Sequence, residues 1–403
     1  MGISKNAVCW LVPDDEGGGI LPVAENCCER ARVAGLQATL LFLRNPTSLV
    51  AACSKFEVDS IRSEQPHDLA PRQTVDWLKR HPQRVLFLND CSQVDVAIPY
   101  IPADVRCVYV VHDTAKRYFS TALHNESQLH AIVAVSETIA AAFRHHLRDP
   151  KKLHVIHNGT SYPHDLETVL NHPREDDVIF LGGDNPTKGA YDAKEIWRHL
   201  QKLRFKGKLH WFGGLSDAFS GELQRLPNAS NLIVYGRVPR TEIFRAAISC
   251  KVFLMLSRVE PFGMATLDCI GMGCTPVAWD ITTGTKEIVA PHEGRFVPLG
   301  AYGKMAASIV EACASHATDF AAVTARIRDD FSDVAMWASY QTLIDQLLAT
   351  PSIERKFAGG IPPPYKSPIR LFQLLPAGAR TAIRRSIGRS PRLGHVLRDF
   401  RGY

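Results

Sequence analysis

The sequence predicts an α/β protein made of two doubly wound parallel-sheet domains, and three observations support this fold class. Short apolar runs alternate with helical patterns along most of the chain. The length of 403 residues is roughly two to three times that of a usual single domain. A polar stretch at 158–176 divides the alternating pattern in two. We therefore expect one domain over residues 1–165 and a second over 175–350.

The expected strands are short apolar runs, which are typical of parallel strands covered on both faces. In the first half they are 7–12, 37–43, 84–88, 106–111, 131–135 and 152–156. In the second half they are 177–182, 208–212, 231–235, 251–256 and 275–278. Three helical patterns follow, and we expect all of them to close the second domain: 304–315, 319–330 and 333–348.

The composition excludes two classes of protein. With 45% hydrophobic and 22% charged residues, the chain is unlike disordered proteins. No apolar run approaches the roughly 18–20 residues of a membrane span, and the N-terminal stretch lacks the features of a secretory signal. The ten cysteines include no Cys-x-x-Cys spacing, so we expect reduced, mostly buried thiols in a cytoplasmic protein.

The positive charge lies at the C-terminal end. Residues 351–403 hold 11 Lys and Arg against two acidic residues, a net charge of +9, while the whole chain carries +6. Residues 359–364 (Gly-Gly-Ile-Pro-Pro-Pro) predict a stiff linker into this basic tail. Its basic charge, together with its apolar residues, favours contact with an anionic membrane surface. The alternatives are a tail that packs back on the body, and nucleic-acid binding, for which stacking aromatics between the arginines are missing.

The loops after the expected strands are candidate sites, because ligands of open α/β sheets bind beyond the carboxyl ends of strands. The loop after 7–12 contains Gly17 and Gly18, which let backbone amides approach a ligand. Pro22 replaces the third glycine of a dinucleotide fingerprint, and a plain flexible turn is the alternative. His112 directly follows 106–111 and can donate to a substrate hydroxyl, or it can be a structural histidine.

A lysine follows the first strand of the second half. The strand at 177–182 leads into glycines and then into Lys188-Gly189, just before a helical pattern. A lysine there can neutralise a diphosphate through a charged hydrogen bond of about 1.5–3 kcal/mol. The alternative is an exposed lysine at the start of a helix.

The stretch after 251–256 places Glu260 in a turn and Asp268 inside the helix that follows. Glu260 can reach a sugar hydroxyl and Asp268 a ribose on the far side of the phosphates, although a solvated pair of acids is the alternative. The first helical amides have no intrahelical partner and form an anion site: those of Gly263, Met264, Ala265 and Thr266.

In this order the motifs resemble those of retaining nucleotide-sugar glycosyltransferases of family 4, whose GT-B fold has two Rossmann-like domains that face a cleft. The resemblance covers about residues 5–345 and is most specific over 251–290. It is carried by Val155-Ile156-His157-Asn158-Gly159, Gly182 to Lys188-Gly189, Val234-Tyr235-Gly236-Arg237-Val238, Ser257 to Gly263 with Asp268, Gly273-Cys274-Thr275-Pro276-Val277 and Glu287-Ile288-Val289.

The resemblance implies a donor bound mainly by the second domain. Lys188 would hold the diphosphate, Glu260 the transferred sugar and Asp268 the ribose hydroxyls. The backbone around Arg237 and Val238 would meet the base.

The resemblance also implies that the amides after Phe262 bind phosphate, and that the first domain reaches toward the sugar and acceptor. The implied catalytic residues are His112, Lys188 and Glu260. The implied donor-binding residues are Gly17, Gly18, Lys188, Arg237, Val238, Glu260, Phe262, Gly263, Met264, Ala265 and Asp268.

Two positions depart from the family pattern. The second glutamate of Glu-x7-Glu is Asp268, and Gly183 stands where the family often has an arginine. Diphosphate neutralisation would then rest on Lys188 and amides, or on another basic residue. No two aspartates lie two residues apart, and no His/Cys/Asp cluster has ligand spacing, so the sequence predicts no metal and no other cofactor.

Together these features predict an enzyme that moves a hexose, of mannose or glucose type, from a nucleotide diphosphate sugar to a lipid-linked or polysaccharide acceptor in bacterial cell-surface glycan synthesis. We expect it in the cytoplasm, peripheral on the inner face of the membrane, without nucleic-acid binding. The alternative is a non-catalytic binding or scaffold protein of the same fold.

Overall fold

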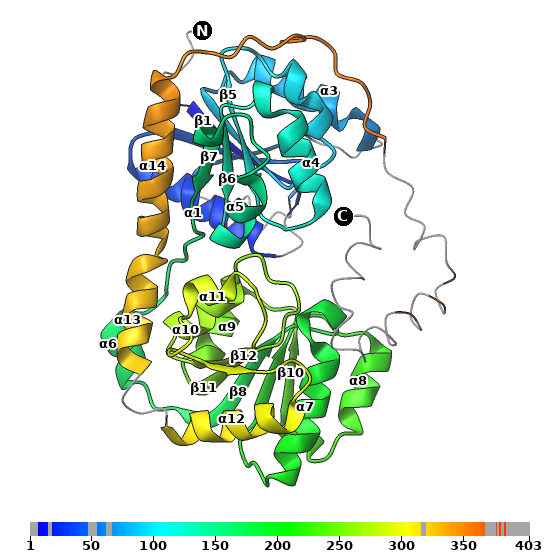
Figure 1. Cartoon of the computed structure of the whole chain (residues 1–403), viewed down its shortest axis with the longest axis vertical. Helices are drawn as coiled ribbons and strands as arrows, with labels where there is room; N and C mark the ends of the chain where they lie inside the picture. The colour runs from blue at the N-terminus through cyan, green and yellow to red at the C-terminus, as the bar shows by residue number, and fades with distance from the viewer. Residues whose placement is uncertain are drawn as a thin grey trace. The chain divides into compact units, whose positions relative to one another are not determined.

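The computed structural model describes residues 7–14, 18–46, 55–61, 67–315 and 320–366, with the single positions 376, 379 and 383. The chain divides into two compact units (Figure 1). One contains the residues up to Ser161 and the segment that begins at Phe331, and the other is built around Tyr162–Asp330.

The first unit holds a seven-stranded parallel sheet in the order β3-β2-β1-β4-β5-β6-β7. Its strands are β1 (Ala7–Val12), β2 (Gln37–Phe42), β3 (Glu57–Ser60), β4 (Val85–Asn89), β5 (Arg106–Val111), β6 (Ala131–Ala134) and β7 (Leu153–Val155). Its α-helices are α1 (Ile20–Val33), α3 (Ala70–Arg80), α4 (Lys116–His124), α5 (Glu137–Phe143) and α14 (Asp333–Ala349). Short 3-10 helices are η1 (His67–Leu69), η2 (Asp95–Tyr100), η3 (Glu126–Gln128) and η4 (Pro150–Lys152).

The second unit holds a six-stranded parallel sheet in the order β10-β9-β8-β11-β12-β13. Its strands are β8 (Glu175–Leu181), β9 (Leu209–Phe212), β10 (Leu232–Gly236), β11 (Cys250–Met255), β12 (Thr275–Trp279) and β13 (Arg295–Val297). Its helices are α6 (Leu166–Asn171), η5 (Pro186–Lys188), α7 (Ala190–Lys202), α8 (Asp217–Gln224), η6 (Ala229–Asn231), α9 (Arg240–Ala247), α10 (Met264–Gly271), α11 (Thr285–Ile288), α12 (Tyr302–Ser315) and α13 (Phe320–Asp330).

The second sheet is buried on both faces, as the apolar runs predict. Along β11, Val252 and Leu254 join one core cluster with Trp197 of α7, while Phe253 joins another with Phe244 of α9. Successive side chains of a strand point to opposite faces, so a continuous apolar run is needed to fill both cores. The predicted α/β fold class is therefore confirmed.

One helix belongs to a different unit from the one predicted. We expected 333–348 to close the second domain, but α14 packs along α1 in the first unit. Tyr340 meets the ring of Trp10 edge-on at 6.4 Å, and Arg30 Nε lies 2.6 Å from Asp333 Oδ2. The predicted domains, 1–165 and 175–350, are therefore wrong at the C-terminal end, because the chain returns to the first unit at Phe331. An amphipathic pattern shows that a helix buries one face, and it leaves open which sheet receives that face.

The segment after α14, residues 351–366, packs on the first unit, and we call it the strap (Figure 1, orange). Arg355 is only 3% exposed and donates to the carbonyls of Gln128, Ile101, Pro102 and Val105. Further along, the Gly359 amide donates to the Tyr100 carbonyl and the Tyr365 amide to that of Asp68. The predicted stiff linker is therefore part of the folded unit, while the expected basic tail lies, apart from three single positions, outside the described residues.

Two further expectations concern the membrane and the thiols. None of the helices that the structure describes is both long and apolar enough to span a bilayer. The nine cysteines within the described ranges are buried and form no disulfide.

Candidate active site

The candidate donor site lies at the switch point of the second sheet. The strand order reverses between β8 and β11, and α7 and α10, the helices that follow these strands, contribute to the core clusters on opposite faces of the sheet. In open α/β sheets this is where ligands bind. The loop after β8 carries Lys188, and the loop after β11 carries Glu260.

The loop of Lys188 is held by its own side chains and by the end of β11. Asn185 Oδ1 accepts from the amide and the hydroxyl of Thr187, at 3.0 and 2.8 Å, and caps η5. Gly189 has φ +84°, and a Cβ there would lie 2.4 Å from Leu256 Cβ. Only glycine allows this approach, so the Lys-Gly pair fixes the lysine against the neighbouring strand.

Lys188 and Glu260 form an ion pair, with 2.6 Å between Nζ and Oε2. The carboxylate is 12% exposed and the ammonium 38%, so the lysine keeps access to solvent while the glutamate is mostly enclosed. The Glu260 carbonyl also accepts from the Gly284 amide at 2.8 Å, which ties the loop to the start of α11. The structure therefore brings together the two residues on which the predicted site depends.

The N-terminus of α10 lies beside Glu260. Gly263 caps the helix with φ +115°, and a Cβ there would lie 3.5 Å from Glu260 Cγ. The Thr266 amide, which we expected to lack a partner, donates to the Gly263 carbonyl at 2.9 Å because the helix begins with a tight turn. The amides that precede it at the N-terminus of the helix favour an anion. Two threonine hydroxyls also lie near the position of a Cβ built at Gly263, at 3.0 Å for Thr266 and 3.1 Å for Thr285. Both are buried and have no hydrogen-bond partner among the described residues.

Asp268 lies inside α10 and pairs with Arg240, the first residue of α9. Arg240 donates from Nε to Oδ2 at 2.9 Å and from Nη2 to Oδ1. The two hydrogen bonds make a bidentate ion pair, in which the Asp268 side chain is 8% exposed and the Arg240 side chain 24%. The predicted contact of Asp268 with ribose is untested, and Arg240 is a partner that the sequence did not suggest.

The remaining residues of the second unit that we predicted to contact the donor lie in the loops and helix that follow the carboxyl ends of its strands. Phe262 is buried, so its backbone is what it offers to a ligand, and Met264 and Ala265 are half-buried in the first turn of α10. Arg237 is exposed, and Val238 packs against a core cluster.

The departure at Gly183 has a steric cause. Its φ is +52°, and a Cβ would lie 2.6 Å from the Gly214 carbonyl oxygen, so an arginine does not fit there. The side chain of Arg237 lies beside Gly214, with Nε 3.2 Å from the point where a Cβ would stand. Arg237 therefore places a positive charge on a loop next to the one that contains Gly183.

In the first unit, His112 follows β5 and bonds to Asn89 at the end of β4, with 2.9 Å between Nε2 and Oδ1. The Asn89 amide nitrogen donates to the carbonyls of Leu11 and Phe87, which directs its oxygen to the histidine. Nε2 therefore carries the proton. Burial lowers the pKa of His112 to about 4, so the ring is neutral at pH 7.

The glycines after β1 are placed in part. Gly18 is exposed, has φ +108° and has open space where a Cβ would stand, and its contact with a ligand remains a prediction. Gly17 lies outside the described residues.

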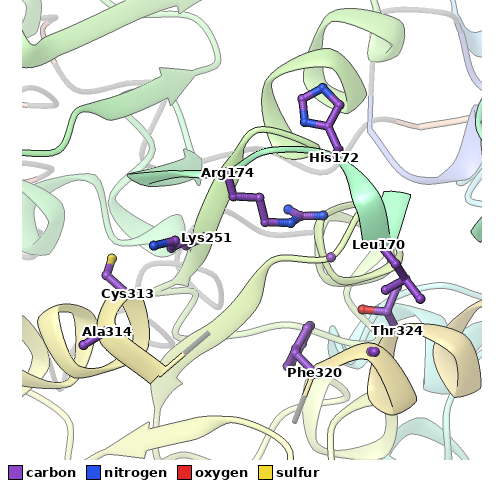
Figure 2. Close-up of a pocket in the computed structure, with 10 residues that line it drawn as sticks. Leu170, His172, Arg174, Lys251, Cys313, Ala314, Phe320 and Thr324 are labelled. Carbon is purple, nitrogen blue, oxygen red and sulfur yellow. The ribbon is translucent and has the colours of Figure 1, made fainter. Parts of the chain in front are cut away.

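A cavity of about 340 Å³ lies elsewhere in the second unit (Figure 2). Its lining includes Arg174, which precedes β8, and Lys251 near the start of β11, so it opens at the amino ends of the strands. Arg174 donates to four backbone carbonyls, and Lys251 Nζ lies 2.6 Å from Asp176 Oδ1. Both side chains are therefore paired with groups of the protein, and the cavity is separate from the candidate site.

The part of the chain that the structure describes contains no group of three His, Cys, Asp or Glu arranged to hold a metal ion. The predicted independence from metal remains a prediction.

A buried ion pair near the site was not predicted from the sequence either. Arg258 and Asp192 form a buried pair behind the Lys188 loop. The signal was present, since Arg258 lies two positions before Glu260 in the most informative stretch, but a charged residue in a loop predicts exposure.

Comparisons with known proteins agree with this architecture. Residues 17–161 match the family described as Glycosyltransferase Family 4, and residues 166–317 match Glycosyl transferases group 1. No curated protein matches the sequence.

Solved structures share the fold at low identity. The Anabaena protein Alr3699/HepE, in complex with UDP and glucose, has a TM-score of 0.67 at 15% identity over 84% of this chain and 99% of its own. S. aureus TarM, a G117R mutant in complex with UDP among other ligands, has 0.70 at 10% over 84% and 100%. A glycosyltransferase from Rickettsia africae has 0.66 at 15% over 85% and 98%. With both sheets and both family matches in place, the chain belongs to the family 4-like glycosyltransferases of the GT-B fold.

Proposed function

We propose that the protein is a retaining, metal-independent hexosyltransferase. It moves a hexose of glucose or mannose type from a nucleotide diphosphate sugar to a lipid-linked or polysaccharide acceptor in bacterial cell-surface glycan synthesis. The observation that carries the proposal is the convergence of Lys188, Glu260 and the first turn of α10 at the switch point of the second sheet. The UDP in the HepE and TarM structures supports a nucleoside diphosphate as leaving group.

The chain's own residues suit this reaction. When the bond between the sugar C1 and the phosphate oxygen breaks, negative charge grows on that oxygen. Lys188 and the first amides of α10 are fixed in position before the reaction, and such preorganised groups are the strongest source of stabilisation. Glu260 would accept a hydrogen bond from a sugar hydroxyl, and Asp268 from the ribose.

The acceptor oxygen would bond to C1 on the face that the phosphate leaves, so the anomeric configuration is retained. The acceptor proton passes to the leaving phosphate, which departs as the nucleoside diphosphate. His112, neutral and donating through Nε2 to Asn89, keeps Nδ1 as a hydrogen-bond acceptor for a substrate hydroxyl.

A panel of UDP-glucose, UDP-galactose, GDP-mannose and ADP-glucose tests the proposal, with thermal shift and slow donor hydrolysis measured with and without EDTA. We expect one donor to raise the melting temperature and to be hydrolysed at the same rate in EDTA. Early NMR spectra of the released sugar should show the donor's anomeric configuration. Binding without hydrolysis or transfer would favour the scaffold function, and loss of activity in EDTA would overturn metal independence.

The membrane contact is a separate part of the proposal. Residues 367–403 hold eight arginines and one aspartate, a net charge of +7, and each cation near anionic lipid contributes about 1 kcal/mol. The strap that precedes them exposes Ile361 at 70% and Phe357 at 44%. Because the strap is part of the folded first unit, the test is a chain that ends after Lys366. It should release from phosphatidylglycerol vesicles yet hydrolyse donor normally, and unchanged vesicle binding would reject the role of the tail.

A further inference from the structure

A buried ion pair lies directly behind the candidate donor site. Arg258 Nη2 is 2.8 Å from Asp192 Oδ2, and the two side chains are only 3% and 2% exposed. Burying two charges costs several kcal/mol per ion, and apolar residues often replace such pairs without loss of stability. Stability is therefore a weak reason for the pair, and its position needs another explanation.

Arg258 joins the two loops of the site. It belongs to the loop that carries Glu260, two positions further along. Its backbone amide donates to the Thr187 carbonyl at 2.9 Å, and its Nη1 donates to the Pro186 carbonyl at 3.0 Å. Both acceptors lie in η5, the turn that ends at Lys188. One residue thus sets the spacing between the segments that carry the ammonium and the carboxylate.

Asp192 holds the guanidinium in a defined orientation. It lies in the first turn of α7, and its carboxylate also accepts from Tyr302 Oη at 3.1 Å and from Trp279 Nε1 at 3.3 Å. Tyr302 comes from α12 and Trp279 from β12. Arg258 therefore takes its orientation from three separate elements of the sheet and its helices.

We propose that Arg258, oriented by Asp192, is a positioning residue that holds Lys188 and Glu260 at the spacing that receives the donor diphosphate and sugar. This inference rests on the proposed function. Arg258 is buried behind the loops and acts through Lys188 and Glu260.

The chain offers a matched control in Arg174. This arginine is also mostly enclosed in the second unit and donates to the carbonyls of Ala247, Cys250, Val169 and Met272, but it lies at the amino ends of the strands, away from the candidate site. A purely structural arginine should affect folding and leave the donor affinity of the folded protein unchanged. The donor affinities of Arg258→Lys and Arg174→Lys can therefore be compared, with the melting temperature of each variant as the measure of its structural damage.

The experiment measures Kd for UDP, GDP and ADP by calorimetry, and KM and kcat for the active donor. We expect Arg258→Lys to raise Kd and KM at least tenfold, while Arg174→Lys keeps both within twofold. Asp192→Asn should act like Arg258→Lys, and the double variant should be no worse than either single one, because both remove the same contact. A Kd within twofold of wild type for Arg258→Lys overturns the inference.

Three further outcomes separate a failure of folding, of the proposed function and of the positioning role. If Arg258→Lys does not fold, Tyr302→Phe takes its place, since it removes one contact of Asp192 at the edge of the network; we expect a rise in KM of about threefold, and an unchanged KM overturns the inference. If wild type binds none of the three nucleotides, the proposed function fails and the inference fails with it. If Lys188→Ala loses binding while Arg258→Lys keeps it, only the positioning role is wrong.

Discussion

Lys188 Nζ lies 2.6 Å from Glu260 Oε2, although 72 positions of sequence separate the two residues. The contact exists because β8 and β11 are neighbours at the point where the strand order reverses. It also means that the lysine has a carboxylate partner before any donor binds. In the proposed function, a diphosphate would share or replace that partner, so the pair would couple the recognition of phosphate and sugar.

Gly263→Ala should damage the site locally. The new Cβ would be placed at φ +115° and within 3.1 Å of two threonine hydroxyls, and left-handed backbone costs a non-glycine residue about 1–2 kcal/mol. We expect a lower melting temperature and weaker nucleotide binding. Gly221→Ala is the control, because Gly221 lies within α8 with open space around it, and the change should stabilise by about 0.5–1 kcal/mol. Equal behaviour of the two variants would contradict the account.

Asp268→Asn tests whether this carboxylate reads the ribose. The change weakens the two-point contact with Arg240, for which we expect a loss of about 2 kcal/mol in the free energy of unfolding. Wild type should bind a nucleoside diphosphate more tightly than its 2′-deoxy form, and Asp268→Asn should bind both alike, as calorimetry can show. If the variant keeps the full preference for the ribose hydroxyl, Asp268 serves Arg240 alone.

His112 should stay neutral over the physiological range. Burial lowers its pKa to about 4, below the usual value of about 6.5. Because the folded pKa is depressed, the folded state binds fewer protons than the unfolded state. The resulting stability is present above pH 6.5 and is lost as the pH falls toward 4.

NMR titration of the labelled imidazole measures this directly. We expect a midpoint near 4 and no protonation between pH 6 and 8, so that His112 does not shape the pH profile of transfer in that range. A midpoint near 6.5 would mean that the ring is solvated and lacks the enclosure described here.

The strap should contribute to the stability of the first unit. Arg355→Ala leaves four carbonyls without their charged donor, and we expect a loss of about 2–3 kcal/mol in the free energy of unfolding. Lys356→Ala, at an exposed neighbour, should change stability by less than about 0.5 kcal/mol. A chain that ends at Thr350 should melt well below one that ends at Lys366. Equal melting temperatures would show that the strap is a passive linker.

Most of the strands are predictable from the sequence, because a parallel strand covered on both faces needs a continuous apolar run. The exceptions are β3 and β13. Strand β3, Glu57–Ser60, has one apolar residue among four, and β13 has three residues; both are edge strands, which need less burial. The predicted unit of α14 was also wrong, because the surface against which an amphipathic helix packs is decided by the tertiary structure.

For the site, motifs predicted which loops matter, and topology decided which side chains meet. The proximity of Lys188 and Glu260 follows from adjacent strands, which the order of motifs indicates. The pairing of Asp268 with Arg240 and of Arg258 with Asp192 depends on the packing of α9 and α7, which no local pattern encodes. The reason for a glycine at position 183 could not be predicted from the sequence, because the residue that leaves no room for a side chain, Gly214, lies in a different loop, after β9.

The most direct test of the donor site is the affinity of Lys188→Ala for UDP, GDP and ADP. Lys251→Ala is the matched control, since Lys251 also lies 2.6 Å from a carboxylate, but near the amino end of β11. We expect Lys188→Ala to weaken binding of the preferred nucleoside diphosphate at least tenfold and Lys251→Ala to bind as wild type does. Equal affinity of Lys188→Ala and wild type would rule out the donor site proposed at Lys188.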